Sequence, residues 1–390
     1  MPQKQNANIV ERNAPITEYK AIDFFCGGGG MTCGLRQAGI NVVAGVDFDK
    51  NAQATYEYNN PGSKFIHTDI RRLRSNYFER HFGIQRNDEH LILVGCSPCQ
   101  YYSIINTDRT KSELSKTLLM NFARFIEYYN PGYILVENVP GIVTNKESVF
   151  PRFMKKLNRL GYRVKWEIVD MSHYGVPQSR RRFSLIATRL NREISLPAKD
   201  NTILTVNDVL GEKNGFKKIT AGYKDSTSFA HTTAGLSDVC LRRLAVTPHD
   251  GGDRLSWKDN PELQLSCYIG KDAYFKDTFG RIWWNKPSPT ITTKFFSISN
   301  GRFAHPDEDR ALSIREGATL QTFPKDYEFK TNSIAAAARI IGNAVPCENG
   351  NVITADAYEG KTITVKGIVD YFNGSYQIKV LSAKDITIIG

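Results

Sequence analysis

Short apolar runs separated by helical patterns dominate the first half of the chain. The runs lie at 21–25, 41–47, 91–95, 133–139, 162–170 and 181–188. Amphipathic stretches stand between them, and in the stretch at 113–129 one helical face is shared by Leu118, Phe122, Phe125 and Tyr129. This alternation predicts an α/β fold built on a doubly wound, mainly parallel sheet. Ligands of such sheets bind beyond the carboxyl ends of the strands, so we expect the site there.

The second half of the chain has a different pattern. Residues 190–285 are polar and irregular, which predicts a smaller region of loops and short strands. Regular structure is expected to return at 287–295, followed by helices at 309–323 and 333–346. In the tail, alternating residues around Ile363 and Val365 precede Asn373-Gly374, which predicts a β-hairpin with a two-residue turn.

Charge and cysteine content narrow the class of protein. The net charge of +11 favours a polyanionic partner, because clustered lysine and arginine attract phosphate backbones. The seven cysteines are irregularly spaced and the N-terminal residues lack an apolar signal segment, which favours a reducing, cytoplasmic setting over a secreted disulfide framework. No apolar run reaches the roughly 20 residues that span a bilayer, so we expect no membrane role.

Four consecutive glycines follow the first apolar run, in "DFFCGGGGMTCGL". Glycine lets the backbone approach a bound ligand closely, and the following helix N-terminus favours a carboxylate or phosphate. Asp47 ends the second run, where an acidic residue can hold the hydroxyls of a ribose, and Phe48 beside it can face an adenine ring. The contiguous glycines depart from the G-x-G-x-x-G fingerprint, so the residues predict a nucleotide-type ligand without identifying it; a flexible turn beside a solvated aspartate is the alternative.

The stretch "LILVGCSPCQYYS" places Cys96 and Cys99 two residues apart at a strand end. A redox pair would need a helix N-terminus in a thioredoxin-like context, and a zinc site would need a second cysteine or histidine pair. The chain has no second Cys-x-x-Cys, so no metal site is predicted. The remaining alternatives are a buried structural cysteine and a nucleophile with a partner acid.

Polar residues at two further strands bear on that choice. Glu137 ends the run at 133–139, so its carboxyl group is expected at the same sheet edge as Cys99, either as a functional acid or as a cap for the next turn. Gln178, Arg180 and Arg182 precede or begin the run at 181–188, with alternate arginines on one side. These arginines can position a phosphate or a base carbonyl, or they can form a solvated edge.

Taken in order, these motifs resemble those of the DNA (cytosine-5)-methyltransferases of bacterial restriction-modification systems. The matching motifs, which extend from about 20 to 346, are "DFFCGGGG", "GVDFD", "TDI", "GCSPCQ", "VENVPG", "QSRRRF", "REGATLQTFP" and "GNAVP". The resemblance implies a Rossmann-like methyltransferase fold and S-adenosyl-L-methionine as the methyl donor. The residues implied at the cofactor are Phe25, Gly27, Gly29, Gly30, Asp47, Phe48, Asp69, Ile70, Pro98, Asn343 and Val345.

The resemblance also implies roles at the reacting base. Cys99 is the implied nucleophile that adds to C6 of cytosine, Glu137 is the acid that engages the ring, and Arg180 with Arg182 steadies the C2 carbonyl. These groups cannot reach C6 in a stacked duplex, so the cytosine must be flipped out of the helix. The base that removes the C5 proton is not identified. The expected DNA contacts are Gln100, Ser103, Gln178, Gly251, Gly252, Thr292 and Lys294.

The predicted organisation has four parts: a catalytic and cofactor-binding part at 1–189, a target-recognition domain at 190–285, a return segment at 286–346 and a β-rich tail at 347–390. After "GNAVP" the family has a second proline and a closing helix, whereas Cys347 and β-like sequence follow here. The tail is expected to be either an OB-like piece or an inert β appendage. The missing helix puts the packing of the cofactor lid in doubt.

The expected partner is duplex DNA, and we expect a monomer with a cognate restriction endonuclease acting on the same site. Two related alternatives remain open, a tRNA cytosine-5 methyltransferase and a catalytically weak DNA-binding relative. The long region at 190–285 favours DNA over tRNA, and the presence of Cys99 and Glu137 favours catalysis. A dinucleotide-dependent dehydrogenase fits only the first 50 or so residues.

Overall fold

The structure is a computed structural model that describes residues 18–98 and 117–347, together with the backbone of four strands between 362 and 389. The elements of the first half are β1 (Lys20–Phe24), α1 (Gly30–Gln37), β2 (Asn41–Asp47), η1 (Lys50–Ala52), α2 (Gln53–Asn59), β3 (Lys64–His67), α3 (Tyr77–Phe82), β4 (Leu91–Gly95), α5 (Leu118–Tyr129), β5 (Tyr133–Asn138), α6 (Gly141–Thr144), α7 (Phe150–Arg159), β6 (Arg163–Asp170), η2 (Met171–His173) and β7 (Arg181–Thr188). All six strands predicted from the apolar runs are present, and β3 is an additional one.

These seven strands form one sheet in the order β3-β2-β1-β4-β5-β7-β6. The first five strands are parallel, while β7 runs antiparallel to both β5 and β6. The prediction of a doubly wound, mainly parallel sheet is therefore confirmed. The strand order reverses between β1 and β4, and the crevice at such a reversal is where ligands of these sheets bind.

Helices cover both faces of the sheet, so its central strand is apolar along its whole length. Every residue of β4 (Leu91–Gly95) is buried. On one face the aromatic side chains of α3, α5 and α7 pack against β1 and β4, with Phe24 and Phe125 at 4.8 Å between ring centroids. On the other face α1 contributes Met31 and Leu35. Helix α5 begins at Leu118, and the preceding predicted positions 113–116 lie outside the described residues.

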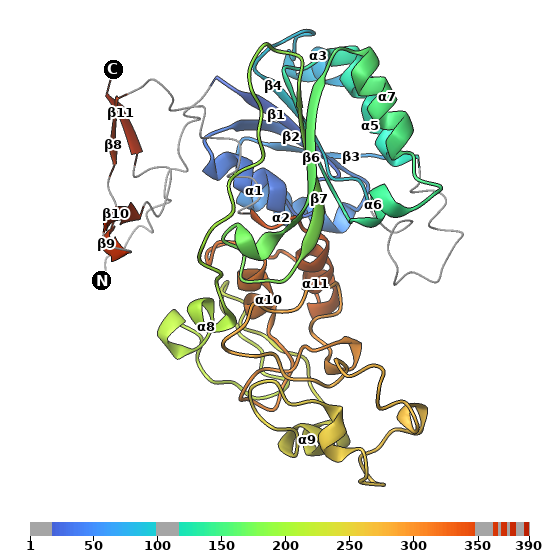
Figure 1. Ribbon diagram of the computed structural model, residues 1–390, viewed down its shortest axis with the longest axis vertical. Coiled ribbons are helices and arrows are strands. Elements are labelled where there is room, and N and C mark those ends of the chain that lie inside the picture. The colour runs from blue at the N-terminus through green and yellow to red at the C-terminus, as the bar shows by residue number, and fades with distance from the viewer. Residues whose placement is uncertain are drawn as a thin grey trace, which may run out of the picture.

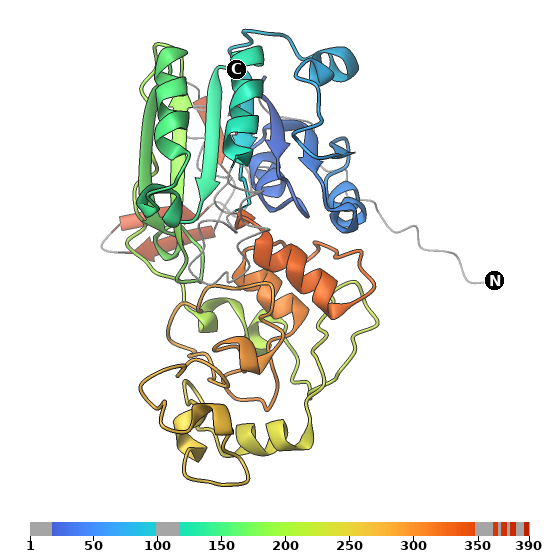
Figure 2. The ribbon, with the colours of Figure 1, turned by 90° about the vertical axis from the view of Figure 1, so that its right-hand side faces the viewer.

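The second half of the chain lies below the sheet in Figure 1, with α10 and α11 between the two parts. Its elements are α8 (Val206–Val209), η3 (Glu212–Asn214), α9 (Asp238–Ala245), η4 (Arg254–Trp257), η5 (Ser266–Tyr268), η6 (Ile298–Asn300), α10 (Ile314–Leu320) and α11 (Ile334–Asn343). Figure 2 shows how little regular structure this lower part contains. Ser313 and Glu316 form a capping box, so α10 begins at Ile314 and is shorter than predicted.

The predicted regular structure at 287–295 is wrong. Ser288 makes a single isolated bridge to Gln178, and the rest of this stretch is a connecting segment. Its apolar residues pack on helices rather than joining a sheet, since Ile291 and Phe295 belong to the buried cluster around α10 and α11.

Buried arginines take the place of secondary structure in the lower part. Arg281 is fully buried and donates to the carbonyl oxygens of Leu244 (2.9 Å), Thr247 (3.2 Å), His305 (3.0 Å) and Glu308 (2.8 Å). Arg302 donates to three carbonyls in the same way, at residues 251, 252 and 281. A planar guanidinium with five donors suits this task, because loop carbonyls buried without partners are costly. Some of the net positive charge is therefore internal and unavailable to a polyanion.

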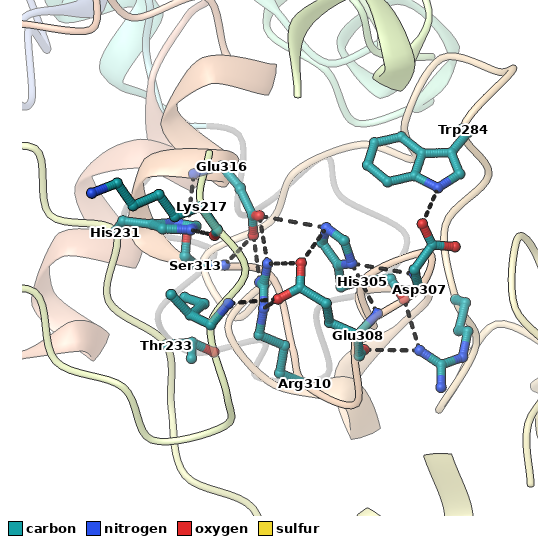
Figure 3. A network of polar contacts seen from close by, with 12 residues as sticks. Lys217, His231, Thr233, Trp284, His305, Asp307, Glu308, Arg310, Ser313 and Glu316 are labelled. Atoms are coloured by element: carbon teal, nitrogen blue, oxygen red, sulfur yellow. Dashed lines mark hydrogen bonds and ion pairs between the residues drawn. The ribbon is translucent and has the colours of Figure 1, made fainter. Parts of the chain in front are cut away.

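Another buried arginine, Arg310, belongs to a buried network of charges (Figure 3). Arg310 donates to both oxygens of Glu316, at 2.7 and 2.8 Å, and also to Glu308. His305 lies 3.3 Å from Glu308 and 3.7 Å from Glu316. Burial lowers the pKa of His305 to about 4, while Arg310 outweighs burial and lowers the pKa of Glu316 to about 2. The network joins α10 to the loops around it.

The tail contains four described strands, β8 (Thr362–Val365), β9 (Ile368–Phe372), β10 (Ser375–Lys379) and β11 (Ile386–Ile389). Strand β9 pairs antiparallel with β10, and the Phe372–Ser375 register leaves two residues between the strands, as a two-residue hairpin requires. Asn373 and Gly374 themselves lie outside the described residues. Within the described tail these strands form two separate two-stranded sheets. No helix in the described part of the chain is long and apolar enough to span a membrane.

Candidate active site

The first part of the site is the turn after β1. Phe25 has a left-handed backbone conformation, with φ of 65°, and its N–H donates to the Val46 carbonyl at 2.7 Å. A bulky residue in this region is strained by about 1–3 kcal/mol, a feature that concentrates at ligand sites. Gly27 follows with φ of 51° and donates its N–H to Oδ2 of Asp47 at 2.8 Å. A Cβ on Gly27 would meet nothing within 4 Å, so open space lies beside this residue.

The other three glycines of the tract face protein instead. A Cβ on Gly28 would lie 2.2 Å from the Ile340 side chain, and one on Gly30 would lie 2.4 Å from the Val345 carbonyl oxygen. A Cβ on Gly29 would lie 2.6 Å from the Asn60 amide. The Cβ positions of Gly29 and Gly30 are filled by protein, which lets α1 pack closely against α2 and the return segment. Their predicted place along the cofactor, which would involve backbone atoms, stays a prediction.

Asp47 and Phe48, at the end of β2, form the second part. Asp47 accepts from Gly27 through one oxygen and from the Asp49 N–H at 2.8 Å through the other. Burial raises the pKa of Asp47, although these two N–H donors oppose the rise. The Phe48 ring is 72% exposed. An exposed ring of this size beside a fixed carboxylate is the arrangement that a nucleoside needs, with a ring to stack on and an acceptor for its hydroxyls.

Two predicted cofactor residues after β3 are placed differently. The Ile70 side chain is buried in the sheet core, so only the backbone of this residue is left for the predicted cofactor contact. The Asp69 carboxylate is held by Arg71, whose Nε donates at 2.9 and 3.0 Å, and this contact lowers the pKa of Asp69. Pro98 is half-buried and is the last described residue before 117. Val345 is buried beside Gly30, whereas Asn343 is exposed at the end of α11.

Cys99, Gln100 and Ser103 lie outside the described residues, whereas the end of β4 and the residues up to Pro98 are described. Asn138, at the end of β5, donates to both the carbonyl (3.1 Å) and the hydroxyl (3.0 Å) of Ser97. This clip ties the exit of β4 to the end of β5. Burial, reinforced by the nearby Glu137, raises the pKa of Cys96. Cys96 therefore resists forming the thiolate that a nucleophile needs.

Glu137 and Arg182 meet at the same edge of the sheet. Nε of Arg182 lies 2.9 Å from Oε1 of Glu137, and the two side chains are only 13% and 11% exposed. Glu137 pairs across the ladder with Ser184 of β7, which brings Arg182 to the carboxylate from the start of that strand. Below them is a small, largely apolar hollow of about 50 Å³, whose wall includes Leu135, Ile186 and Pro197. A buried carboxylate with one cationic partner opens onto space at this point.

Gln178 and Arg180 do not face that space. Gln178 is fully buried and donates to the Leu320 carbonyl (3.0 Å) and the Gln321 side chain (2.9 Å). Arg180 is 3% exposed and donates to the carbonyls of Ile291 (3.1 Å) and Ala344 (3.2 Å). Full burial contradicts the predicted DNA contact of Gln178. The predicted base contact of Arg180 stays a prediction, because a flipped base itself enters a closed pocket. Both side chains fasten the return segment to the start of β7.

The remaining predicted DNA contacts divide in the same way. Gly251 is pressed against the Trp283 ring, where a Cβ would lie 1.8 Å from the indole nitrogen, and Gly252 is pressed against the Pro248 backbone. Protein atoms therefore occupy the space beside both glycines, and the side on which a Cβ would stand is not open to a phosphate. Lys294 is exposed and Thr292 is half-buried near it in the sequence, so both remain accessible for the predicted contact with DNA.

Sequence reasoning missed a buried polar chain beneath the glycine turn. Thr32 of α1 donates to Oδ2 of Asp23 at 2.7 Å and contacts the Tyr56 hydroxyl at 3.1 Å, and Tyr56 lies 2.7 Å from Ser63. Burial raises the pKa of Asp23 to about 7. Among the described residues, no hydrogen-bond partner reaches Oδ1 of Asp23. The signal in the sequence was an aspartate in the middle of an apolar strand, "AIDFF".

The seven-stranded sheet, in which β7 runs antiparallel between β5 and β6, and the glycine turn at the strand-order reversal match a Rossmann-like methyltransferase fold. Similar folds occur in a prophage-encoded DNA modification methyltransferase from E. coli, with TM-score 0.68 and 23% identity over 87% of this chain and 98% of that chain. The Dnmt2 methyltransferase of S. pombe gives TM-score 0.57 and 18% identity over 87% and 98% of the two chains. These likenesses concern the fold.

Sequence comparisons identify the family. The family model of C-5 cytosine-specific DNA methylases matches residues 19–359. The type II methylase M.HgiDII of Herpetosiphon aurantiacus is 37% identical over 85% of this chain and 93% of its own. The type II methyltransferase M.Sau96I of Staphylococcus aureus is 31% identical over 84% and 73% of the two chains. The chain belongs to the C-5 cytosine-specific DNA methylase family, and it transfers a methyl group from S-adenosyl-L-methionine to C5 of cytosine in DNA.

Proposed function

We propose that the reaction proceeds through a covalent adduct between Cys99 and C6 of an extrahelical cytosine, with Glu137 engaging the ring. The observation that supports this most directly is the buried Glu137–Arg182 pair, which stands beside the strand exit leading to Cys99. The Asn138–Ser97 clip sets the direction of that exit. Cys96 is unsuited to the role because burial raises its pKa.

The residues of the glycine turn and of the β2 end fit the cofactor. Gly27 borders open space, Asp47 presents fixed carboxylate oxygens, and Phe48 offers an exposed ring. In this proposal Asp47 holds the ribose, Phe48 packs on the adenine and Gly27 lies along the methionine half. S-Adenosyl-L-methionine, when bound there, supplies an electrophilic methyl group.

The chain's own residues prepare C5 to accept that methyl group. The Cys99 thiolate adds to C6, which makes C5 electron-rich, and Glu137 shares a proton with N3 to offset the charge that develops on the ring. Arg182 holds the Glu137 carboxylate in one orientation. After methylation a base removes the C5 proton, the thiolate leaves C6, and the double bond returns. The target base must leave the duplex to reach these groups, which costs a few kcal/mol.

We propose the following organisation around this site. Residues 1–189 and 286–346 build the catalytic part, 190–285 read the target sequence, and 347–390 are an appendage. Several relatives carry type II names, which supports a companion restriction endonuclease that acts on the same site. We further propose that the chain is a cytoplasmic monomer. Bisulfite sequencing of DNA from cells that express the chain would reveal the target, and light scattering during gel filtration would give the oligomeric state.

A duplex with 5-fluorocytosine at the target tests the adduct. Fluorine cannot leave C5 as a cation, so elimination stops and the protein stays attached to the DNA after denaturation. We expect the attached species with the wild-type chain and with Cys96→Ala, and not with Cys99→Ala. A Cys99→Ala variant that still methylates DNA, or equal loss in both cysteine variants, would refute the proposed nucleophile.

A further inference from the structure

Residues 268–277 of the lower part, called here the aromatic loop, expose apolar side chains to an unusual degree. Ile269 and Tyr274 are each 67% exposed, and Phe275 is 61% exposed. Burying a side chain of this size is worth about 1.5–3 kcal/mol, so leaving several of them in water in one loop forgoes substantial stabilisation. Contiguous exposed apolar groups of this kind mark interaction surfaces.

The aromatic loop is held in shape from beneath by one buried arginine. Arg254 is fully buried, and its guanidinium donates to the carbonyls of Lys271 (2.7 Å), Tyr274 (2.6 Å) and Phe275 (3.2 Å). The same guanidinium lies 4.5 Å from the centroid of the Tyr268 ring. The rings at the tip are therefore displayed on a fixed backbone, which reduces the entropy that binding would cost.

Backbone strain at the tip points the same way. Phe275 has a left-handed conformation, with φ of 54°, which is costly for a bulky residue. Beyond it the chain is anchored again, because Phe279 is buried and Asp277 accepts from Nε of Arg302 at 3.1 Å. The fold thus maintains a strained backbone while the Phe275 ring stays in solvent. Packing alone does not account for this arrangement.

The surroundings of the rings suit a nucleic acid. Lys271 and Lys276 are exposed on either side of Tyr274 and Phe275, while the two aspartates of the loop face other cations: Asp272 lies 3.6 Å from Nζ of Lys258 and Asp277 accepts from Arg302. Aromatic rings interleaved with lysines form the usual surface for stacking on bases while cations meet phosphates. In Figure 1 the amber segment around this loop and helix α6, which follows Glu137, both lie on the right-hand side of the molecule.

We propose that the aromatic loop enters the target duplex, and that Tyr274 and Phe275 stack on bases next to the flipped cytosine. This inference rests on the proposed function, since it requires a duplex engaged at the Glu137 edge of the sheet. The two rings compensate for stacking lost when the target base leaves the helix. They are positioning residues, because they contact the DNA beside the reacting base and not the base itself.

The test compares wild type with the double variant Tyr274→Ala/Phe275→Ala on a duplex that carries the recognised sequence with 2-aminopurine in place of the target cytosine, where its emission rises when the base is flipped out of the stack. Stacking is worth about 1–3 kcal/mol per base, so we expect the Kd for this duplex to rise at least about tenfold and the 2-aminopurine signal to fall. Affinity for S-adenosyl-L-methionine and the melting temperature should stay unchanged. Phe275→Tyr should bind like wild type because it keeps the ring.

Ile203→Ala is the matched control, since it removes an exposed apolar side chain outside the loop and should leave duplex binding unchanged. If the double variant binds and flips like wild type while the wild type methylates DNA, this inference fails and the proposed function stands. If the wild type neither binds nor methylates any duplex, the proposed function fails, and this inference fails with it. A wild-type dimer that the double variant converts to a monomer would assign the loop to self-association and overturn the proposal.

Discussion

Nε of Arg182 lies 2.9 Å from Oε1 of Glu137 where β7 passes the end of β5. Strand β7 runs antiparallel to β5, so its first residues arrive at the edge where the parallel strands end. A residue from the beginning of one strand thereby meets a residue from the end of another. The reversed strand supplies a cation to the carboxylate that a purely parallel sheet would lack at this position.

The first prediction concerns this pair. Glu137→Gln removes the carboxyl group that we propose shares a proton with the ring, so kcat should fall by about 100-fold or more, within the range expected for acid–base groups. Arg182→Lys keeps a positive charge but loses the planar guanidinium, so a smaller loss is expected. Single-turnover methyl transfer measures both effects, and S-adenosyl-L-methionine affinity serves as the control. Wild-type rates in Glu137→Gln would exclude a chemical role for the carboxylate.

The second prediction concerns cofactor binding. Asp47→Ala removes both acceptors that hold Gly27 and Asp49, so the Kd for S-adenosyl-L-methionine should rise at least about tenfold, equivalent to about 1.4 kcal/mol. Asp49→Ala is the matched control, because the Asp49 side chain only caps η1 at Asn51. Calorimetric titration measures both variants. Equal affinities in the two variants would place the cofactor away from the β2 end.

The third prediction concerns Asp23. Its pKa in the folded chain, about 7, lies above the ordinary value of 3.8, so ionisation opposes folding. The free energy of unfolding contributed by this group should decrease as pH rises from about 4 to about 7 and then level off. Asp23→Asn keeps an acceptor for Thr32 but cannot ionise. Its stability relative to wild type should therefore increase with pH by a few kcal/mol, since one pKa unit corresponds to about 1.4 kcal/mol.

Urea unfolding at several pH values between about 5 and 8 tests this sign. A difference between Asp23→Asn and wild type that does not change with pH would mean that Asp23 titrates normally. A difference of the opposite slope would mean that its charged form is stabilised by the fold.

The fourth prediction concerns the buried network of Figure 3. Glu316→Gln leaves Arg310 with a weaker set of buried acceptors, so the free energy of unfolding should fall by about 3–5 kcal/mol. The pKa of Glu316 in the fold, about 2, lies below its ordinary value of 4.5. Its contribution is therefore present above pH about 4.5 and is lost as pH falls towards 2.

Glu262→Gln is the control for this prediction. Glu262 forms an ion pair with Arg242 in which both side chains are mostly exposed, and such pairs contribute about 0–1 kcal/mol. Thermal unfolding should separate the two variants clearly. Similar losses in both would mean that the Arg310–Glu316 pair is replaced by other contacts when it is broken.

Much of the fold followed from local pattern. The runs at 41–47, 91–95 and 181–188 predicted strands with bounds that the structure reproduces. The continuous apolar run of β4 suits a strand buried on both faces, and the alternating residues of β7 suit a strand with one more exposed face. The positions of Asp47 and Glu137 at strand ends followed as well, since a parallel sheet brings strand ends to one edge. The strand bounds and the residues at the strand ends could be predicted because each depends only on the sequence of one strand.

The lower part was not predictable in the same way. Its shape depends on Arg254, Arg281 and Arg302, each of which binds carbonyls distant in sequence. An arginine that will be buried looks the same in a sequence as one that will meet phosphate. The net charge therefore overstated the basic surface, and it gave no indication of which cations are exposed.

The sequence by itself determined the sheet, its edge and the residue types that stand there, because period-two apolar runs and glycine turns act through local geometry. Only the tertiary structure decided which of those residues face open space. Gly27 borders the crevice while Gly28 and Gly30 pack on the return segment, and Arg182 reaches Glu137 while Arg180 holds Ala344. Adjacent residues of one motif were assigned to ligand or to packing by segments far away in the chain, and contacts of that kind leave no periodic signal in the sequence.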